Sequence, residues 1–350
     1  MKILFLYTEL AEYVIKSCEA LAKDAEVHII RWPVNKEAPF EFEFPAALTV
    51  YNKADYSPTS LKSLVDSISP DLLVCSGWID KDYLKVVKSR KGQIPTVLAL
   101  DTHWAGTLKQ QLARVLSPFF IKTLFSHAWV PGTPQKKYAV RLGFPEKNIR
   151  TGFYSCDLSR FNSYYHSALS AKRNRFPRRF VFAGRYYRFK GVRDLWEAFA
   201  GLSEAEKNGW ELWCMGTGTE LPEKAEGIKH LGFVQPRDLG PVLEQTGVFV
   251  LPSHFEPWAV VVQEFAAAGF PLLLSNAVGA SEAFLREGKN GYSFPSGDVK
   301  ALRTLLKKIA SLSDKELHLM AEKSHELAQY NGPVQWAATA LDIYNDWHKK

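Results

Sequence analysis

The sequence has few cysteines, no long apolar run and none of the common nucleotide-binding motifs. Its four cysteines are scattered without the paired spacing of a metal site, which indicates reduced thiols of a cytosolic protein. No run approaches the ~20 apolar residues of a transmembrane helix. The apolar start 1–7 is too short for a signal peptide, because Glu9 follows at once. The lack of a GxGxxG or P-loop pattern disfavours dinucleotide and ATP sites.

The composition is that of a folded protein long enough for two domains. The chain has 350 residues, of which 46% are hydrophobic and 23% charged, as in an ordinary globular protein. The formal net charge of +7 favours an anionic ligand or an anionic surface. No DNA- or RNA-binding motif accompanies this charge, so nucleic acid is not an expected partner.

Short apolar runs alternate with amphipathic segments in both halves of the chain. The runs are continuous rather than alternating, which is typical of a parallel sheet covered by helices on both faces. The polar, basic stretch 157–179 interrupts this rhythm without a sustained period, and we interpret it as an interdomain linker. We therefore expect two doubly wound α/β domains that face each other across a cleft. The expected strands are 3–7, 27–32, 48–51, 72–75, 96–100, 128–130, 180–183, 212–215, 230–233, 248–251 and 272–275.

Two glutamates stand eight residues apart around an expected helix start. Glu256 lies in the loop after strand 248–251, and Glu264 lies about two turns into the helix that follows. Ligands of open α/β sheets bind at the carboxyl ends of the strands. The helix N-terminus between the two acids offers partial positive charge and free N–H groups, which suit a phosphate. The pair predicts a polyhydroxylated, phosphorylated ligand, although glutamates at this spacing are also common in ordinary helices.

Two cations follow the first strand of the second half. Gly184 allows a tight turn after strand 180–183, and Arg185 and Lys190 then stand at a strand end and a helix start. From these positions they can bind a diphosphate; the alternative is a solvated basic loop. A further glycine turn, 216–218, follows the next strand and is weak evidence by itself.

Taken in order, these segments resemble the retaining glycosyltransferases of family 4, which have the GT-B fold. The most specific part of the resemblance is 180–287, and the first half resembles the family more loosely. The matching segments are 183–185 with 190–191, 216–218, 231–234, 252–253, Glu256 with Glu264, 269–271, and in the first half 130–133, 143–149 and 157–161. The resemblance implies transfer of a sugar from a nucleotide diphosphate sugar with retention of anomeric configuration.

The resemblance also implies an order of domains. We expect an N-terminal acceptor-side domain over 1–157, a linker over 158–178 and a nucleotide-sugar-binding domain over 179–332. The last helix, 333–350, is expected to return to the N-terminal domain. The expected location is cytoplasmic, with peripheral contact at the inner face of a membrane left open.

Four residues match the family's catalytic and donor-binding positions most directly. Arg185 and Lys190 match the pair that binds the diphosphate and stabilises the leaving group. Glu264 matches the acid that holds the ribose hydroxyls, and Glu256 matches the acid beside the donor sugar. The other implied donor contacts are mostly through the backbone, at Gly216, Gly232, Phe233, Val234, Trp258, Ala259 and Val260. The family needs no obligatory metal or other cofactor, and its leaving phosphate is usually described as taking the acceptor proton during front-face attack.

The acceptor side is less well defined. His103 follows the expected strand 96–100 and matches the family's cleft histidine, which could donate a hydrogen bond to the leaving phosphate or the donor sugar. A structural histidine at a strand end is the alternative. Segment 8–11 lacks the glycines that many relatives carry, and Ala259 replaces a frequent glycine. These departures leave the sugar and the acceptor, a glycan or a lipid-linked molecule, undetermined.

Asp80-Lys81-Asp82 has the metal-binding DxD pattern of the other large glycosyltransferase fold. Here it precedes an expected helix, so an N-cap with acidic residues in the first turn is the favoured interpretation.

Segment 108–125 mixes large apolar residues with Lys109, Arg114 and Lys122 and could lie on an anionic membrane. We favour a core helix with a solvated polar stripe. The basic cluster within 172–179 could likewise touch lipid headgroups or remain in water.

Alternative functions are a non-catalytic nucleotide-sugar-binding protein and a GT-B-fold phosphorylase or epimerase. A retaining glycosidase would also use two carboxylates but does not need a pair of cations for a diphosphate.

Overall fold

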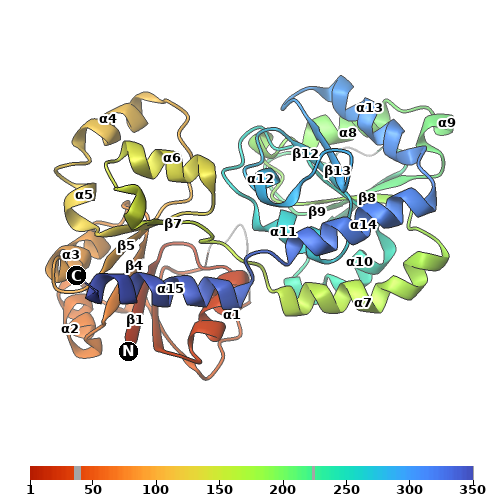
Figure 1. Cartoon of the computed structure of the whole chain (residues 1–350). Coiled ribbons are helices and arrows are strands. Elements are labelled where there is room, and N and C mark those ends of the chain that lie inside the picture. The colour runs from red at the N-terminus through yellow and green to blue at the C-terminus, as the bar shows by residue number, and fades with distance from the viewer. Residues whose placement is uncertain (35–40, 223–224, 350) are drawn as a thin grey trace. The chain divides into compact units, whose positions relative to one another are not determined.

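The computed structural model describes residues 1–34, 41–222 and 225–349, and the chain forms two compact units. The first unit comprises Met1–Asp157 and Asn331–Lys350, and the second comprises Leu158–Tyr330 (Figure 1). Each unit contains one parallel sheet flanked by helices. This confirms the predicted pair of doubly wound α/β domains.

The first unit has a seven-stranded sheet with the order β3-β2-β1-β4-β5-β6-β7. Its strands are β1 (Lys2–Tyr7), β2 (Glu26–Arg31), β3 (Leu48–Asn52), β4 (Leu72–Ser76), β5 (Thr96–Ala99), β6 (His127–Trp129) and β7 (Ile149–Arg150). Its helices are α1 (Glu12–Leu21), α2 (Pro58–Ile68), α3 (Lys81–Arg90), α4 (Leu108–Leu116), α5 (Ile121–Leu124), α6 (Thr133–Arg141) and α15 (Pro333–His348). The two-residue strand β7 was too short to be predicted.

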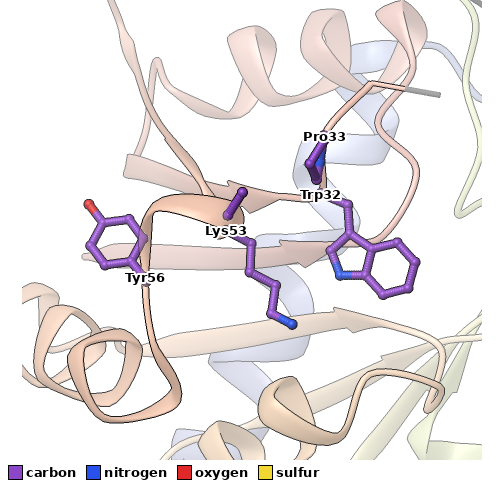
Figure 2. A pocket seen from close by; sticks show the side chains of 5 residues that line it. Trp32, Pro33, Lys53 and Tyr56 are labelled. Carbon is purple, nitrogen blue, oxygen red and sulfur yellow. The ribbon is translucent and has the colours of Figure 1, made fainter. Parts of the chain in front are cut away.

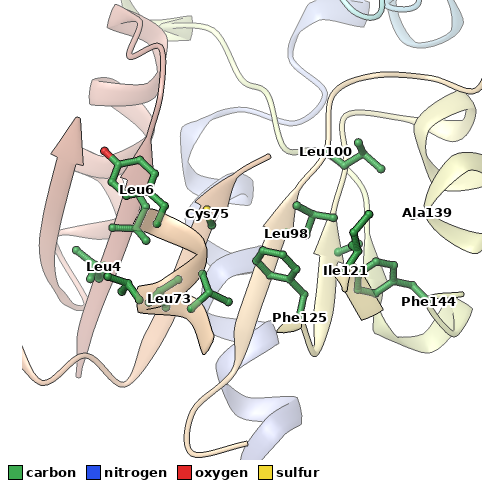
Figure 3. Packing of buried hydrophobic residues seen from close by; sticks show 14 of the residues in the cluster. Leu4, Leu6, Leu73, Cys75, Leu98, Leu100, Ile121, Phe125, Ala139 and Phe144 are labelled. Carbon is green, nitrogen blue, oxygen red and sulfur yellow. The ribbon is translucent and has the colours of Figure 1, made fainter. Parts of the chain in front are cut away.

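The first sheet is buried on both faces because successive side chains of a strand point in opposite directions. Leu4 and Leu6 belong to one core cluster, shown in Figure 3 together with residues of β4 and β5. Ile3 and Phe5 belong to the cluster on the other face. This arrangement explains why the strands have continuous apolar sequences.

The C-terminal helix α15 completes the second of these clusters. Trp336 is buried, its ring stacks on Phe5 with centroids 5.6 Å apart, and its Nε1 donates a hydrogen bond to the carbonyl oxygen of Phe153 at 2.6 Å. The helix also packs along α1. The end of the chain is therefore part of the first unit.

The second unit has a six-stranded sheet with the order β10-β9-β8-β11-β12-β13. Its strands are β8 (Arg179–Ala183), β9 (Glu211–Met215), β10 (Ile228–Gly232), β11 (Val248–Leu251), β12 (Leu272–Ser275) and β13 (Gly291–Phe294). Its helices are α7 (Leu158–Asn174), α8 (Val192–Ala200), α9 (Glu204–Lys207), α10 (Gly240–Gln245), α11 (Val260–Ala267), α12 (Ser281–Phe284), α13 (Val299–Ala310) and α14 (Asp314–Ala328). The edge strand β13 was not predicted, because its short sequence GYSF has no apolar run.

The chain order creates a switch point in the second sheet. From β8 the chain proceeds outward through β9 and β10, and then returns to place β11 on the other side of β8. The crevice between β8 and β11, at their carboxyl ends, is the usual ligand site of such sheets.

The interdomain-linker interpretation of 158–178 is wrong for most of that segment, which forms the helix α7. Phe161, Ala168 and Lys172 are buried at helical spacing, and α7 packs on α10, α11 and α14. The period was missed because a lysine occupies an apolar position. The Lys172 Nζ lies 4.0 Å from the centroid of the Phe270 ring, and burial lowers its pKa to about 7. This lysine is therefore unavailable to lipid headgroups.

The core-helix interpretation of 108–125 is also wrong for its first half. Of the nine residues of α4, all of them described, Gln110 alone is buried. In the described part of the chain, no helix is long and apolar enough to cross a membrane.

The four cysteines, all of them described, are buried thiols outside any disulfide. Burial raises the pKa of the Cys214 thiol to about 12 and raises those of Cys18 and Cys75 further. These thiols are therefore protonated at neutral pH.

Candidate functional site

The loops after β8 and β11 meet at the switch point of the second sheet. A short 3-10 turn, η3 (Arg188–Lys190), follows β8, and Gly191 is both its C-cap and the N-cap of α8. The His254 N–H donates a hydrogen bond to the carbonyl oxygen of Phe189 at 2.7 Å. The turn that carries Lys190 is thus held against the loop that carries Glu256.

Lys190 and Glu256 form an ion pair across this junction. The Lys190 ammonium bonds to Glu256 Oε2, and the Ser253 hydroxyl donates to the same oxygen at 3.2 Å. The side chains of Lys190 and Glu256 are only 17% and 10% exposed. Because little water screens the pair, its electrostatic interaction is stronger than that of a surface ion pair.

The backbone after Glu256 is fixed by a second loop. The Gly279 N–H donates to the Glu256 carbonyl oxygen at 2.9 Å, and the Ala280 N–H donates to that of Trp258 at 2.9 Å. The Trp258 side chain is buried, with its ring edge-on to Phe284 at 6.4 Å. These contacts bring the chain to the N-terminus of α11, where Val260 is the first helical residue.

Ala259 immediately precedes α11 with a left-handed backbone, φ +80° and ψ +89°. A Cβ makes this region unfavourable by about 1–2 kcal/mol, and glycine avoids that cost. The unusual residue lies three positions after the buried carboxylate of Glu256. A glycine, which the family resemblance leads us to expect here, would adopt this backbone conformation without the strain that Ala259 bears.

Replacement of Ala259 by glycine is expected to stabilise the protein by about 0.5–1 kcal/mol, because relief of the left-handed strain exceeds the added freedom of the unfolded chain. Thermal unfolding measures the change. Ala268→Gly is the matched control, since Ala268, the C-cap of the same helix, has φ −76° and its replacement by glycine is expected to destabilise the protein. An Ala259→Gly variant that melts at or below the wild-type temperature would contradict the assignment.

Glu264 and Arg185 lie on the same two elements that provide the ion pair. Glu264 is half-buried in the second turn of α11, and Arg185 is half-buried directly after β8. The Arg185 guanidinium lies 5.4 Å from the centroid of the Tyr187 ring. All four predicted donor residues therefore belong to the carboxyl ends of β8 and β11 or to the helix that follows.

The predicted glycines Gly216 and Gly232 join the loops after β8, β9 and β10. The Gly216 N–H donates to the Gly232 carbonyl oxygen at 2.7 Å. A Cβ on Gly216 would lie 1.9 Å from the Gly184 carbonyl oxygen, so only glycine fits. Phe233 and Val234 follow Gly232 and are half-buried. The weak glycine signal in the sequence thus reflects a close approach between neighbouring strand ends.

A neighbouring hydrogen bond between two side chains was missed by the sequence analysis. His254 Nε2 lies 2.6 Å from Asp194 Oδ2 and connects the loop after β11 to α8. The two residues are far apart in the sequence, and neither belongs to a recognisable motif. Their pairing supports the junction on which Lys190 lies.

His103 lies in the first unit, in the loop after β5. The Gln110 side chain donates to its carbonyl oxygen at 2.7 Å. Its ring is partly buried, and burial lowers the pKa of the imidazole, which favours the neutral form. A neutral imidazole retains one N–H donor.

Asp80 is the N-cap of α3, which confirms the favoured interpretation of the DxD sequence. Its Oδ1 accepts hydrogen bonds from the N–H groups of Asp82 and Tyr83, at 2.8 and 3.0 Å. Its Oδ2 accepts from Trp32 Nε1 at 2.6 Å and pairs with Lys53 Nζ at 2.6 Å. Burial by itself would raise the pKa of Asp80, but these donors outweigh it and hold the pKa below its usual value.

An open hollow beside this N-cap is lined by Trp32, Pro33, Lys53, Ala54 and Tyr56 (Figure 2). No sequence motif predicted it, since its residues follow two separate strands. The ammonium of Lys53 is already neutralised by Asp80 and lies 3.6 Å from Asp82. Lys53 therefore stabilises the acidic start of α3. Because its charge is neutralised there, it does not make the hollow a binding site for an anion.

Comparison with known proteins finds similarity to glycosyltransferases, most specifically in the second unit. Residues 177–312 match the family model described as Glycosyl transferases group 1. Glycogen synthase of Mycobacterium tuberculosis is 32% identical over 142 residues, covering 38% of this chain and 34% of the relative. The lipopolysaccharide core biosynthesis glycosyltransferase LpsE of Rhizobium meliloti is 32% identical over 151 residues, covering 41% of this chain and 42% of the relative. The chain thus spans 34 to 42% of the length of these two relatives.

Solved structures are similar over nearly the whole chain. Anabaena HepE in complex with UDP has a TM-score of 0.72 at 16% identity and covers 99% of this chain and 100% of its own. Sucrose-phosphate synthase from Thermosynechococcus elongatus has a TM-score of 0.73 at 17% identity, with full coverage of both chains. At these identities the similarity establishes the fold, which is of the GT-B type.

Proposed function

We propose that this chain is a retaining, hexosyltransferase-type glycosyltransferase that uses a nucleoside diphosphate sugar as donor. The observation that carries the proposal is the ion pair of Lys190 and Glu256 at the switch point between β8 and β11. It places a cation and a carboxylate beside the N-terminus of α11. A diphosphate requires the cation and the helix N–H groups, whereas sugar hydroxyls suit the carboxylate. The match of 177–312 to the group 1 model supports the same assignment.

Lys190 and Arg185 would supply most of the charge stabilisation. As the bond between the anomeric carbon and the phosphate oxygen breaks, negative charge develops on the leaving nucleoside diphosphate. An ammonium has three N–H donors, so Lys190 can hold Glu256 and a phosphate oxygen together. Two side-chain cations can provide the charge that a divalent metal provides elsewhere, and we propose that donor binding does not require one.

Glu256 would orient the donor sugar rather than attack it. Its Oε2 is already engaged by Lys190 and Ser253, which leaves that oxygen less available to attack the anomeric carbon. We propose that the acceptor hydroxyl attacks from the face that the diphosphate leaves, and that its proton passes to the leaving phosphate oxygen. Glu264 would hold the ribose hydroxyls. The backbone around Gly232–Val234 and Trp258–Val260 would contact the base and the phosphate.

The acceptor would be bound by the first unit. We propose a role for His103 as a neutral hydrogen-bond donor to the leaving phosphate or the donor sugar, in agreement with its lowered pKa. A glycan or lipid-linked acceptor, and hence a part in polysaccharide biosynthesis, is proposed by analogy with relatives such as LpsE, whose name describes lipopolysaccharide core biosynthesis. The four buried cysteines, which remain thiols rather than disulfides, support a cytoplasmic location.

The test is a panel of nucleoside diphosphates and their sugars, with and without magnesium. A donor at ~100 times its Kd should stabilise the protein by ~2.7 kcal/mol in thermal unfolding. We expect one base to stand out without magnesium and the matching donor to be transferred or slowly hydrolysed. Arg185→Ala and Glu264→Ala should weaken donor binding, while Glu256→Ala should mainly reduce turnover.

Arg173→Ala is the control for Arg185→Ala, because Arg173 is an exposed arginine on α7 whose side chain pairs with Glu322. Full activity in all three site variants would refute the site. Donor binding without transfer or hydrolysis would indicate a non-catalytic binding protein, and dependence on free phosphate would indicate a phosphorylase.

A further inference from the structure

Helix α4 and the turn after it expose a continuous set of large apolar side chains. Leu108, Leu112, Val115 and Phe119 are 89%, 59%, 67% and 75% exposed. Their spacing of three or four residues places them along one side of a helix. Leu116 and Phe120, also exposed, widen this set. We refer to these six residues as the α4 apolar face.

Polar contacts fix α4 with this face outward. Gln110, on the inner side, accepts a hydrogen bond from the Ala105 N–H at 2.7 Å and donates one to the His103 carbonyl oxygen at 2.7 Å. At the other end, the buried hydroxyl of Ser117 donates to the Leu142 carbonyl oxygen at 2.6 Å. The helix is therefore turned with a glutamine toward the protein and leucines toward the outside, the reverse of an ordinary surface helix.

The sequence segment that carries the α4 apolar face has charged residues of a single sign, although one of them, Lys136, pairs with Glu146 just beyond it. No aspartate or glutamate occurs between Asp101 and Glu146. The cations of this stretch are Lys109, Arg114, Lys122, Lys136, Lys137 and Arg141. Lys109 and Arg114 are exposed on α4 itself, and Lys137 and Arg141 are exposed on α6, which lies in the same part of the first unit (Figure 1). The apolar side chains thus lie within a segment of excess positive charge.

We propose that the α4 apolar face docks on the surface of an anionic lipid bilayer. Its leucines and phenylalanines would enter the boundary between headgroups and acyl chains, and the lysines and arginines would contact lipid phosphates. A protein partner would need an apolar groove surrounded by acidic residues. An anionic bilayer has an apolar interior beneath a negatively charged surface, and it needs no specific shape to match the face. The proposal is independent of the proposed activity, since lipid binding requires neither donor nor acceptor.

The experiment is flotation of the full chain with two kinds of vesicle, pure phosphatidylcholine and phosphatidylcholine with phosphatidylglycerol. We expect binding to the anionic vesicles that weakens at high salt, because salt screens the cations. Leu112→Ser with Phe119→Ser should reduce the partition coefficient by at least about tenfold, since two large apolar side chains are lost from the contact. Lys109→Glu with Arg114→Glu should remove the preference for anionic vesicles.

Matched controls exist elsewhere in the chain. Leu319→Ser with Tyr330→Ser replaces side chains that are 57% and 73% exposed, close to the values of Leu112 and Phe119. Lys315→Glu reverses an exposed charge on α14. Both controls should bind vesicles as the wild type does, and unchanged melting of every variant verifies folding.

Three results would overturn the proposal. One is wild-type protein that does not float with either vesicle. Another is vesicle binding that the Leu112/Phe119 double variant retains in full. The third is wild-type self-association, seen by sedimentation and abolished by the same double variant, without any vesicle binding; the face would then be a contact between copies of this chain.

Discussion

Replacement of Lys190 by alanine is expected to lower kcat/KM for the nucleotide-sugar donor by about 10²–10³-fold. The lysine contributes to the site in two ways. Its ammonium would stabilise the charge that develops on the leaving diphosphate, and it neutralises Glu256, whose side chain is 10% exposed. Without the lysine this carboxylate is left nearly buried and unpaired, which should also destabilise the fold by about 2 kcal/mol. Steady-state kinetics and thermal unfolding of the same variant measure the two effects.

The double variant Lys190→Ala with Glu256→Gln separates the effect of Lys190 on activity from its effect on stability. Glutamine removes the unpaired charge at nearly constant volume, so we expect stability to recover while activity remains low. Lys190→Arg keeps the charge but not the compact ammonium, and should have an intermediate effect. Activity that recovers together with stability in the double variant would show that Lys190 acts only on the fold.

Replacement of Gly191 by alanine is expected to destabilise the protein by about 2–4 kcal/mol. Gly191 has φ +66°, and a Cβ there would lie 2.0 Å from the carbonyl oxygen of Pro252. The two loops would have to separate, and these are the loops that bring Lys190 to Glu256. A decrease of roughly 2–4 °C in Tm per kcal/mol is expected for a unit of this size, together with loss of donor binding.

Gly209 provides the matched control for this substitution. Its φ of +73° is similar, but a Cβ there would meet no described atom within 4 Å. Gly209→Ala should therefore destabilise the protein only by the cost of holding alanine in a left-handed backbone conformation, about 1–2 kcal/mol, and leave donor binding intact. Equal losses in the two variants would contradict a steric role for Gly191 at the loop junction.

Much of the second unit was predictable because its signals are local. Continuous apolar runs located β8, β9 and β11, and the loops after these strands contain Arg185, Gly216 and Glu256. Chain order and strand ends alone place such residues at one edge of a parallel sheet. The roles of Arg185, Lys190, Glu256, Glu264 and His103 in the reaction remain predictions that the variants above test.

The misses have identifiable causes. A buried lysine, Lys172, broke the apolar period of α7, because its long stem can line a core while its ammonium lies over the Phe270 ring. In α4, the amphipathic pattern was recognised but its direction was not. That direction depends on the partners of Gln110 and Ser117, and Ser117 bonds to a residue in a different segment of the chain.

By itself, the sequence determined the two parallel sheets and the positions of most strands, because periodicity and residue order depend on neighbours along the chain. It also predicted which residues make up the candidate site, and that prediction is still to be tested by the variants above. The tertiary structure decided that Lys190 pairs with Glu256, that Gly191 and Gly216 allow strand ends to touch, that Ala259 is held in a left-handed conformation, and that α4 exposes its leucines. Each of these depends on atoms brought together from distant segments, and periodicity along the chain contains no information about such contacts.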